Sequence, residues 1–459
     1  MVKQTEFANK KVLVLGAGVS GISVACILRK LGAAVTLSDA KPAEQLGKDF
    51  SALQSDGIML ALGNQQAELL RGVDYLVLSP GISIYIPLVA AAREQGITVM
   101  SEVEVAYRLS EAPIVAITGT NGKTTTTTLV GEMLKTTGRE VAVGGNIGAA
   151  LSEQALAVKP DGIIVAEISS FQLEGVVNFR PHIAAILNIT PDHLDRHRTM
   201  DIYQQMKEQI FTKQQAADYI ILNYDDLAVR DMAKRAAGKA VYFSLTQSLA
   251  AGAFVEDGNV RISWDGKKTD ICAVSDIKIK GGHNIENALA ACAIGYFTGV
   301  RPEAMAAVLK TFAGVEHRLE FVAEIDGVAY YNDSKGTNPE SSIKALKAFD
   351  GQIILIAGGR DKKTDLTEFM QVAKEKTAHV ILLGEAQQRF AEAAARQDIK
   401  NVHQVFSFDE AVTLAHSLAQ PPQVVLLSPA CASYDMFDNY EQRGKAFKDL
   451  VHRLVRLKP

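Results

Sequence analysis

Short apolar runs alternate with longer amphipathic stretches along most of the chain. The runs 11–15, 75–79, 114–117 and 353–356 are mostly aliphatic, and a turn containing glycine follows each of them within a few residues. An apolar run of this length is typical of a strand in a parallel sheet, because helices cover both faces of such a sheet. The pattern therefore predicts an α/β fold built from repeated strand–turn–helix units.

The strand–turn–helix pattern restarts twice after its first occurrence, which predicts three domains, at 1–110, 111–314 and 315–459. The expected strands are 11–15, 34–38, 75–79, 114–117, 162–166, 183–187, 219–222, 328–331, 353–356, 380–383 and 424–427. The segment 253–274 differs, because its Asp-Gly turns predict short antiparallel strands.

The composition is that of an ordinary globular protein. Of the 459 residues, 47% are hydrophobic and 22% are charged, and the net charge of −4 argues against a general nucleic-acid binder. The four cysteines are widely scattered, which predicts reduced thiols and not a metal or redox motif. We expect a cytoplasmic protein without membrane insertion, because no signal core and no run of about eighteen apolar residues occur.

Residues 118–125 read as a phosphate-binding loop between a strand and a helix. Its candidate nucleotide ligands are Gly119, Thr120, Asn121, Gly122, Lys123, Thr124 and Thr125. Lys123 supplies a full positive charge, and Thr124 offers a hydroxyl to a magnesium ion. Ile117 stands where the general pattern has its first glycine, so the loop is a shortened variant. The alternative is a polar turn that merely opens a helix.

A second glycine-rich turn follows the first strand. Gly16, Gly18 and Gly21 precede a helix, and Asp39 ends the next strand, as in a dinucleotide-binding fingerprint. The turn predicts a nucleotide or diphosphate site, whereas helix–strand packing alone is the alternative. The pattern does not say which nucleotide binds.

Two further residues suggest metal chemistry beside the phosphate loop, and a lysine follows them. Glu167 ends an apolar strand, where an acid commonly holds magnesium, although it would also suit a helix cap. His193 lies in an acidic turn and is a candidate metal ligand or a solvated histidine. Lys207 follows on the next helix and, taken alone, reads as a solvated lysine.

Polar residues also gather after later strands. Asn284 and Asn287 share one helix face and suit a purine edge, although Asn284 would also cap the helix. Arg318 and the segment 332–338 place cations beside polar groups in loops that suit phosphates and carboxylates. The small-residue turn 428–435 can offer backbone amides to an anion.

Taken in order, these motifs resemble one family. Gly-Thr-Asn-Gly-Lys-Thr-Thr (119–125), Glu-Ile-Ser-Ser-Phe-Gln-Leu (167–173) and Asp-His-Leu-Asp (192–195) are followed by Gly-His-Asn-x-x-Asn (282–287), His-Arg (317–318) and Asn-Asp-Ser-Lys-Gly-Thr-Asn-Pro (332–339). The whole series is similar to the ATP-dependent Mur ligases of peptidoglycan synthesis, and the family's own loop is shortened in the same way. Within the family, the N-terminal glycine turn and the segment 428–444 resemble the members that add D-glutamate.

The resemblance implies three α/β domains: an N-terminal Rossmann-like domain that binds UDP, a central P-loop ATPase domain and a C-terminal Rossmann-like domain. The residues it implies for the UDP-linked substrate are Gly18, Val19, Ser20, Asp39, Gly81 and Asn146. Those it implies for ATP, beyond the phosphate loop, are Asn284, Asn287, Arg318 and Asp333. Those it implies for D-glutamate are Thr337, Lys362, Ser433, Tyr434 and Tyr440.

The resemblance also implies the chemistry. D-Glutamate is joined to UDP-N-acetylmuramoyl-L-alanine through an acyl phosphate, with ATP and two magnesium ions, in cell-wall synthesis linked to cell shape and division. The implied catalytic residues are Lys123, Glu167, His193, Lys207 and Lys335, and the implied metal ligands are Thr124, Glu167, His193 and Lys207, the lysine being carbamylated. The expected protein is a monomer that binds no nucleic acid.

Other readings stay open at this point. A Mur ligase that adds another amino acid, or a folylpolyglutamate synthase, resembles the central domain, although the folate enzyme should lack the N-terminal domain. A nicotinamide oxidoreductase would use the turn from Gly16 to Asp39 but would leave the phosphate loop idle. A nucleotide-dependent binding module without catalysis is a further alternative.

Overall fold

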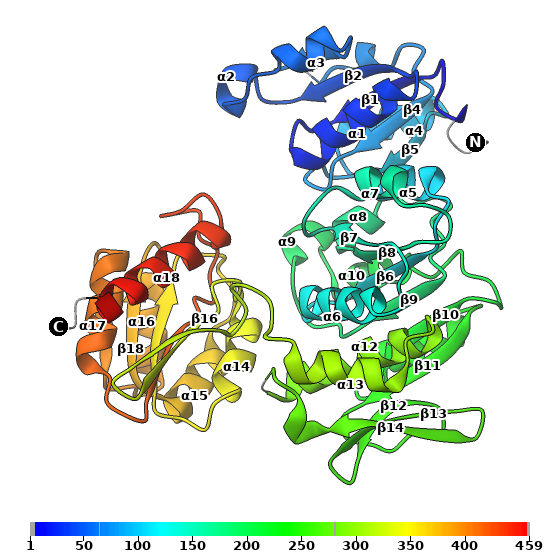
Figure 1. Cartoon of the computed structure of the whole chain (residues 1–459). Coiled ribbons are helices and arrows are strands. Elements are labelled where there is room, and N and C mark those ends of the chain that lie inside the picture. The colour runs from blue at the N-terminus through cyan, green and yellow to red at the C-terminus, as the bar shows by residue number, and fades with distance from the viewer. Residues whose placement is uncertain (1–4, 64, 280, 457–459) are drawn as a thin grey trace. The chain divides into compact units, whose positions relative to one another are not determined.

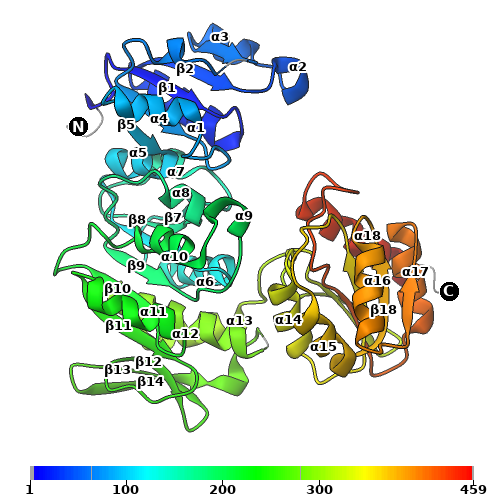
Figure 2. The ribbon, with the colours of Figure 1, turned by 180° about the vertical axis from the view of Figure 1, so that it is seen from behind.

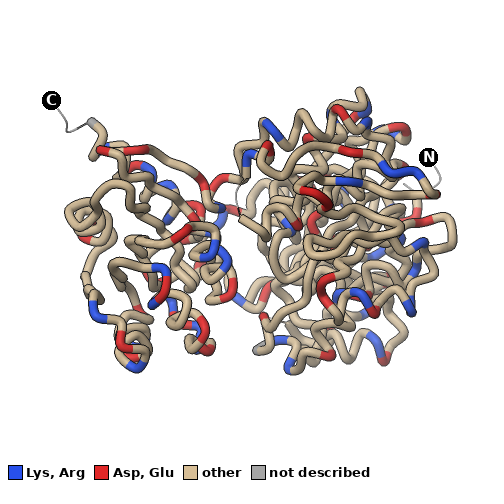
Figure 3. The backbone as a smooth tube through the Cα atoms, turned by 90° about the horizontal axis from the view of Figure 1, so that it is seen from below, with Lys and Arg blue, Asp and Glu red and all other residues tan. Residues whose placement is uncertain are grey.

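The computed structural model of the chain describes residues 5–63, 65–279 and 281–456. They form two compact units, one of Met1–Asp276 with Glu286–Lys310 and the other of Ile277–Ile285 with Thr311–Pro459 (Figures 1 and 2). Within the described ranges, none of the helices is long and apolar enough to span a membrane. Lys and Arg are interspersed with Asp and Glu along the backbone of each unit (Figure 3).

The first unit begins with a five-stranded parallel sheet of order β3-β2-β1-β4-β5. Its elements are β1 (Lys11–Leu15), α1 (Val19–Lys30), β2 (Ala34–Asp39), α2 (Ala43–Leu46), α3 (Ser51–Ser55), β3 (Met59–Leu62), the 3₁₀ turn η2 (Ala67–Leu70), β4 (Tyr75–Leu78), α4 (Pro87–Glu94), β5 (Thr98–Ser101) and α5 (Glu102–Leu109). Successive side chains of β1 enter opposite layers, because Val12 packs with α1 whereas Leu13 packs with α4. Both faces of the sheet are therefore covered, as the apolar runs predict.

The same unit continues with a nine-stranded sheet of order β14-β13-β12-β11-β10-β9-β6-β8-β7. Its elements are β6 (Ile114–Thr118), α6 (Lys123–Lys135), β7 (Val141–Gly145), α7 (Leu151–Ala157), β8 (Ile163–Glu167), α8 (Ser170–Leu173), β9 (Ile183–Ile186), α9 (Leu194–His197), α10 (Met200–Glu208), β10 (Tyr219–Asn223), α11 (Leu227–Arg230), η3 (Asp231–Arg235), β11 (Lys239–Ser244), β12 (Gly252–Glu256), β13 (Asn259–Trp264), β14 (Lys267–Ala273), η4 (Val274–Asp276), α12 (Gly282–Phe297) and α13 (Pro302–Thr311). The strands β12 to β14 are antiparallel to one another, as expected from the Asp-Gly turns.

The two sheets of the first unit share one hydrophobic core, which runs from Phe7 to Met232. Glu104 on α5 reinforces the join, because one carboxylate oxygen accepts the backbone N–H groups of Val177, Asn178 and Phe179, each at 2.9 Å. Glu104 is fully buried and also pairs with Arg108. A paired, hydrogen-bonded carboxylate of this kind fixes the loop before β9 without leaving a buried charge alone.

The second unit holds a six-stranded sheet of order β15-β16-β20-β17-β18-β19, in which only β15 runs antiparallel to its neighbour. Its elements are β15 (Glu320–Ile325), β16 (Val328–Asn332), α14 (Pro339–Lys347), β17 (Ile353–Gly358), α15 (Thr367–Lys376), β18 (Thr377–Leu383), α16 (Gln387–Arg396), β19 (Val402–Gln404), α17 (Phe408–Leu418), β20 (Val424–Leu427) and α18 (Tyr440–Arg456). One layer of helices, α14 to α16, covers one face, and α17 with α18 covers the other.

Candidate active site

The phosphate loop joins β6 to α6, and its two glycines occupy backbone conformations that other residues rarely adopt. Gly119 has φ of 154° and Gly122 has φ of 86°. A Cβ on Gly122 would also lie 2.2 Å from Asn287 Oδ1. Asn287 therefore packs directly against the loop, and its role toward a nucleotide stays a prediction.

Neighbouring loops hold the phosphate loop in place. Asn188 follows β9 and makes two amide hydrogen bonds to Asn121, at 2.8 and 3.1 Å. The Thr120 hydroxyl lies 3.1 Å from the Thr190 carbonyl and 3.2 Å from Tyr203 Oη. Asn121 Nδ2 and Thr125 Oγ1 are buried and make no hydrogen bond within the described chain. The loop is thus rigid while it keeps polar atoms that a phosphate could engage.

Two lysines converge on one carbonyl of this loop. Lys123 Nζ donates to the Gly119 and Thr120 carbonyls at 2.9 and 2.7 Å. Lys207 Nζ, from α10, donates to the same Gly119 carbonyl at 2.8 Å. The sequence does not indicate this proximity, because 84 residues separate the lysines along the chain, from 123 to 207.

Lys207 is only 1% exposed, so the interpretation of it as a solvated lysine is wrong. Burial lowers the pKa of its ammonium well below the ordinary value, and the charge of Lys123 lowers the pKa further. Asp192 and Glu167 act in the opposite direction but do not outweigh burial. A neutral amine is therefore accessible at Lys207, and a neutral amine can act as a nucleophile toward carbon dioxide.

Glu167 ends β8, the strand next to β6, and lies at the level of Ile117. It is 1% exposed, and its Oε1 accepts a hydrogen bond of 2.8 Å from Asn146. Its Oε2 is buried and makes no hydrogen bond within the described residues. An orphaned carboxylate oxygen beside a phosphate loop fits a hard divalent cation, whose preferred ligands are oxygens. Together with the Thr124 hydroxyl, this donor set suits magnesium.

His193 lies on the loop that follows β9, at the start of α9. Its backbone is left-handed, with φ of 54°, and its Nε2 lies 3.6 Å from Asp192 Oδ2. The ring packs edge-on against Phe171 at 4.7 Å. The imidazole is thus exposed with a carboxylate close to it, and its role as a metal ligand stays a prediction.

The N-terminal turn joins β1 to α1. One of its glycines is needed for packing, and another borders open space. A Cβ on Gly21 would lie 1.9 Å from the Gly16 carbonyl, so Gly21 serves helix–strand packing. A Cβ on Gly18 would meet nothing within 4 Å. The Asp39 carboxylate accepts the backbone N–H groups of Ala17 and Lys41, each at 2.9 Å, and so ties two loops together.

The other residues expected for the UDP-linked substrate lie in two places, in or near the loops of the two sheets. Val19 is exposed, Ser20 is half-buried and Gly81 is exposed. Asn146 follows β7 and is bonded to Glu167, so it belongs to the edge that carries the phosphate loop.

In the second unit, the candidate residues follow three adjacent strands, β16, β20 and β17, at one edge of the sheet. Asp333 follows β16 and accepts hydrogen bonds from Ser428 Oγ at 2.8 Å and from the Leu319 N–H at 3.3 Å. Burial raises the pKa of Asp333 to about 6, although Arg318 and the Ser428 hydrogen bond act in the opposite direction. Arg318 Nη1 lies 3.1 Å from Ser341 Oγ, while its buried Nε makes no hydrogen bond within the described part of the chain.

The residues expected for D-glutamate lie in the loops at the same edge and, in the case of Tyr440, at the start of α18. Ser433 is buried, Thr337 and Tyr440 are half-buried, and Tyr434 and Lys362 are exposed. Lys335 Nζ lies 5.4 Å from the centre of the Tyr440 ring, which is a cation–π distance.

Arg443 on α18 joins these loops and is only 1% exposed. It donates to Ser334 Oγ at 2.9 Å and to the Cys431 and Ala432 carbonyls. Burial lowers its pKa to about 10. The structure therefore brings the 332–338 and 428–435 segments together through a buried arginine.

Asn284 lies in the first turn of α12, in the part of this helix that clusters with the second unit, and it is buried. Its role toward a nucleotide stays a prediction.

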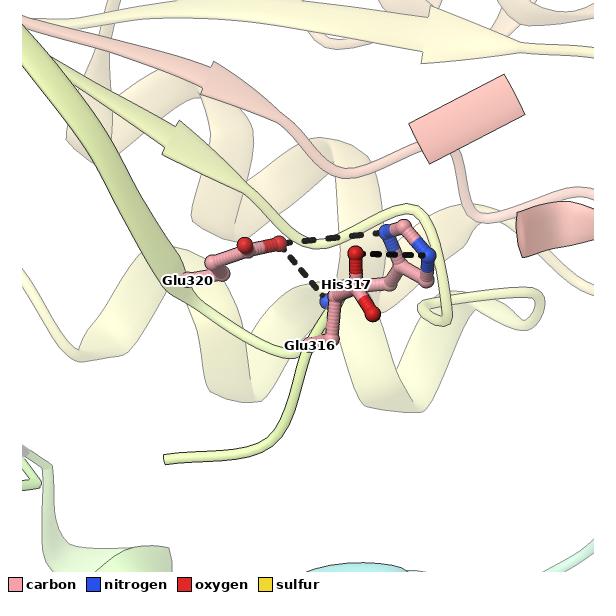
Figure 4. Close-up of side chains that lie close together, drawn as sticks. All are labelled: Glu316, His317 and Glu320. Atoms are coloured by element: carbon pink, nitrogen blue, oxygen red, sulfur yellow. Dashed lines mark hydrogen bonds and ion pairs between the residues drawn. The ribbon is translucent and has the colours of Figure 1, made fainter. Parts of the chain in front are cut away.

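Glu316, His317 and Glu320 offer ligand atoms within 4.8 Å of one another, which is a possible metal geometry (Figure 4). However, the Lys448 ammonium pairs with both carboxylates, at 3.0 Å from Glu320 and at a shorter distance from Glu316. Asn332 Nδ2 also lies 2.9 Å from His317 Nδ1. Lys448 thus offsets part of the negative charge of the cluster, and we interpret the cluster as a support for the loop that carries Arg318.

Sequence reasoning assigned no site role to Asn188, Tyr203 or Arg443, although all three hold candidate loops. Asn188 had a signal, because it follows an apolar strand directly, as Glu167 does. Tyr203 and Arg443 lie within helices, where a buried polar side chain cannot be told from a surface one by sequence alone.

Comparison with known proteins agrees with this geometry. Residues 10–101 match the Mur ligase MurD-like N-terminal domain, residues 117–295 the Mur ligase middle domain and residues 317–431 the Mur ligase glutamate ligase domain. A UDP-N-acetylmuramoylalanine–D-glutamate ligase of Caldanaerobacter subterraneus subsp. tengcongensis is 47% identical over 453 residues, covering 98% of this chain and 100% of the relative. The chain belongs to the Mur ligase family.

Another curated relative and two solved structures are also similar to this chain. The ligase of the same description from Alkaliphilus metalliredigens is 45% identical, covering 98% of this chain and 100% of the relative. Among solved structures, a pseudomurein peptide ligase type C of Methanothermus fervidus is similar at a TM-score of 0.60 and 20% identity, with 97% of this chain and 100% of that chain covered. The UDP-N-acetylmuramate–alanine ligase of Thermotoga maritima gives a TM-score of 0.59 at 18% identity, with 98% and 100% covered. The Mur ligase fold expected from the sequence is confirmed.

Proposed function

We propose that this chain is an ATP-dependent ligase that joins D-glutamate to UDP-N-acetylmuramoyl-L-alanine and releases ADP and phosphate. The observation that carries the proposal is the identity of 45 to 47% with two D-glutamate ligases along their full length. The phosphate loop also supports the proposal, because Lys123 and the buried Lys207 donate to the same carbonyl, that of Gly119. A loop that bound no nucleotide would not need the second lysine. A nicotinamide oxidoreductase would leave this arrangement without a use.

In the first step, an oxygen of the substrate's alanyl carboxylate attacks the γ-phosphorus of ATP, and the bond to the ADP oxygen breaks. Both reactants are anions, and two unit charges at ~4 Å repel by about 4 kcal/mol at an effective dielectric near 20. We assign to Lys123 and the amides of residues 119–125 the neutralisation of the phosphate charge, and Arg318 adds a guanidinium to it.

In the second step, the amine of D-glutamate attacks the acyl carbon, and the bond between that carbon and the phosphate oxygen breaks. The amine proton that is lost leaves with the phosphate. We assign Lys335 to the charge that develops in this step. Thr337, Lys362, Ser433, Tyr434 and Tyr440 are the proposed contacts of D-glutamate.

We propose the remaining substrate contacts as follows. Gly18, Val19, Ser20, Asp39, Gly81 and Asn146 bind the UDP-linked substrate, and Asn284, Asn287 and Asp333 bind the nucleoside part of ATP.

Magnesium, when bound, would screen the phosphate charges and orient the attacking carboxylate. Thr124 and Glu167 are the proposed ligands of one ion, since Glu167 Oε2 is buried without a hydrogen bond in the described chain. His193 and a carbamate on Lys207 are the proposed ligands of a second ion. The cytoplasmic location, the monomeric state and the link to cell division stay predictions.

The function can be tested by measuring phosphate release with a panel of UDP-muramoyl precursors and amino acids. Release should require ATP, UDP-N-acetylmuramoyl-L-alanine and D-glutamate together. A preference for another amino acid would move the chain to another branch of the family. Release without any amino acid would support a nucleotide-dependent module instead.

A further inference from the structure

Arg196 on the short helix α9 reaches across the first unit to the N-terminal sheet. Its Nη1 donates to the Pro80 carbonyl at 2.9 Å, and its Nη2 donates to the Ile82 carbonyl at 2.8 Å. Its Nε and Nη2 also pair with the Glu174 carboxylate, and the guanidinium lies 4.2 Å from the centre of the Phe171 ring. The side chain of Arg196 is 13% exposed, and that of Glu174 is 1% exposed.

This arrangement requires a guanidinium. The planar group donates in two directions at once, to a carboxylate on one side and to two carbonyls on the other, while its face covers an aromatic ring. A lysine would keep the charge but could not span Glu174 and both carbonyls. The geometry is therefore specific to arginine and is not a general attraction between charges.

The contacts of the Arg196 side chain join two segments with proposed roles. The two carbonyls flank Gly81, which is a proposed contact of the UDP-linked substrate. Arg196 lies three residues after His193, and its N–H donates to the His193 carbonyl at 3.1 Å. The guanidinium is thus the link between the turn 80–82 and the turn that carries a proposed metal ligand.

The same cluster continues to the phosphate loop. Glu174 Oε1 lies 3.6 Å from Nδ1 of His197, which is fully buried. The His197 ring packs against Tyr203 at 5.3 Å, and Tyr203 Oη lies 3.2 Å from Thr120 Oγ1. An uninterrupted series of packed side chains therefore runs from the turn 80–82 to the ATP-binding loop.

We propose that Arg196 is a positioning residue, which holds the turn 80–82 in register with the His193 turn so that the alanyl carboxylate meets the phosphate loop. It acts through Gly81 and His193 and does not touch the reacting atoms. The proposal rests on the proposed function, because it assigns Gly81 to the UDP-linked substrate. A misplacement of about 1 Å at the reacting centre is enough to slow such a step about 100-fold.

The test is the variant Arg196→Lys, which keeps the charge and loses the two-sided contact. The matched control is Arg261→Lys, because Arg261 also makes a two-point contact with carboxylates, those of Asp257 and Asp270, but lies on β13, five strands away from β6 in the sheet. For Arg196→Lys we expect KM for UDP-N-acetylmuramoyl-L-alanine to rise about 10-fold or more and kcat to fall. The Kd for a non-hydrolysable ATP analogue and the melting temperature should stay close to those of the control.

A purely structural role for Arg196 predicts a different pattern. The melting temperature would fall and activity would drop with the folded fraction, while KM of the remaining enzyme would be unchanged. That result would overturn the proposal. If Arg196→Lys does not fold, Glu174→Gln decides, since it keeps the shape and removes the charge that orients Arg196. An unchanged KM in folded Glu174→Gln would then overturn the proposal.

The proposed function and the positioning role of Arg196 can be disproved separately. If the unaltered chain binds no UDP-linked substrate and releases no phosphate, the proposed function fails. If the unaltered chain is active and both variants keep its KM, only the positioning role of Arg196 fails.

Discussion

Burial decides the chemistry of single residues in this chain, and Lys207 is the clearest case. Its amine is neutral at a lower pH than an ordinary lysine, because its folded pKa is lowered by burial and by Lys123. We expect the neutral amine to take up carbon dioxide as a carbamate. Carbon-13 NMR of the chain in labelled bicarbonate should show a carbamate signal that weakens as the pH is lowered.

The signal should be absent from Lys207→Arg, because arginine keeps the charge and forms no comparable carbamate. Lys213→Arg is the control, since Lys213 is exposed and lies six residues further along. A signal that survives in Lys207→Arg would contradict the assignment.

Lys123 carries the second prediction at this scale. Lys123→Ala should lower kcat at least about 100-fold, as does the loss of one preorganised charge-stabilising donor in other enzymes. The fold should persist, because the lysine donates to two carbonyls of its own loop, those of Gly119 and Thr120, and does not connect distant strands through them. Lys135→Ala, at the exposed end of the same helix, serves as the control, and circular dichroism checks the fold. A folded Lys123→Ala with nearly normal kcat would remove the phosphate-loop assignment.

Asp333 yields a prediction about pH and stability. Its folded pKa of about 6 lies above the value of an unfolded aspartate, so the folded state binds the proton more tightly. The buried charge therefore costs stability fully above about pH 6, and the cost vanishes as the pH falls through the unfolded value near 4.

Asp333→Asn should remove this cost, which is on the order of 2 kcal/mol for the unliganded chain. The variant should raise the melting temperature more at about pH 7.5 than at about pH 4.5. Asp449→Asn on the exposed face of α18 should show no such difference. Equal shifts at the two pH values would mean that Asp333 is not strained by burial.

At the scale of elements, substitutions of two glycines in the turn between β1 and α1 should have opposite consequences for folding. A side chain at Gly18 would enter open space, whereas one at Gly21 would collide with the Gly16 carbonyl. Gly18→Leu should thus fold normally and weaken binding of the UDP-linked substrate about 10-fold or more, with ATP binding unchanged. Gly21→Leu should unfold the N-terminal sheet.

Calorimetric titration with UDP-N-acetylmuramoyl-L-alanine and with an ATP analogue would measure the two affinities of Gly18→Leu. Unchanged affinity for the UDP-linked substrate would disprove the role of this turn. Tight binding of NAD by the unaltered chain would favour the dinucleotide reading.

Most strands with a long apolar run could be predicted from the sequence, whereas short, edge or glycine-containing strands could not. Every expected strand is present, with bounds that differ by at most three residues from those expected. The strands β3, β5, β7, β11, β15 and β19 lacked a sufficient signal. β3, for example, is an apolar run of only four residues at a sheet edge, which is too short to be told from a helical segment by its pattern.

The residues that hold the candidate site in place were harder to predict than the residues proposed to bind its substrates or metal. Glu167 and Lys123 lie at strand ends or helix starts, where a local pattern marks them. Arg196 and Tyr203 act through partners more than eighty residues away, as in the Arg196 bond to Pro80 and the Tyr203 bond to Thr120. Such roles depend on tertiary packing, which no short motif encodes.

At the scale of the whole molecule, the proposed reaction draws on both compact units. The phosphate loop, Glu167, His193 and Lys207 belong to the first unit, and Arg318, Lys335 and Ser433 belong to the second. A chain that only hydrolysed ATP would use water as the nucleophile, whereas the proposed ligase uses the alanyl carboxylate. The origin of one phosphate oxygen therefore distinguishes the two.

The most direct test uses UDP-N-acetylmuramoyl-L-alanine labelled with oxygen-18 in its alanyl carboxylate. The reaction with ATP and D-glutamate is followed by mass spectrometry of the phosphate and of the UDP-linked product. The account predicts one heavy oxygen in each released phosphate and an equal amount of the D-glutamyl product. Unlabelled phosphate, or phosphate without the product, would contradict it.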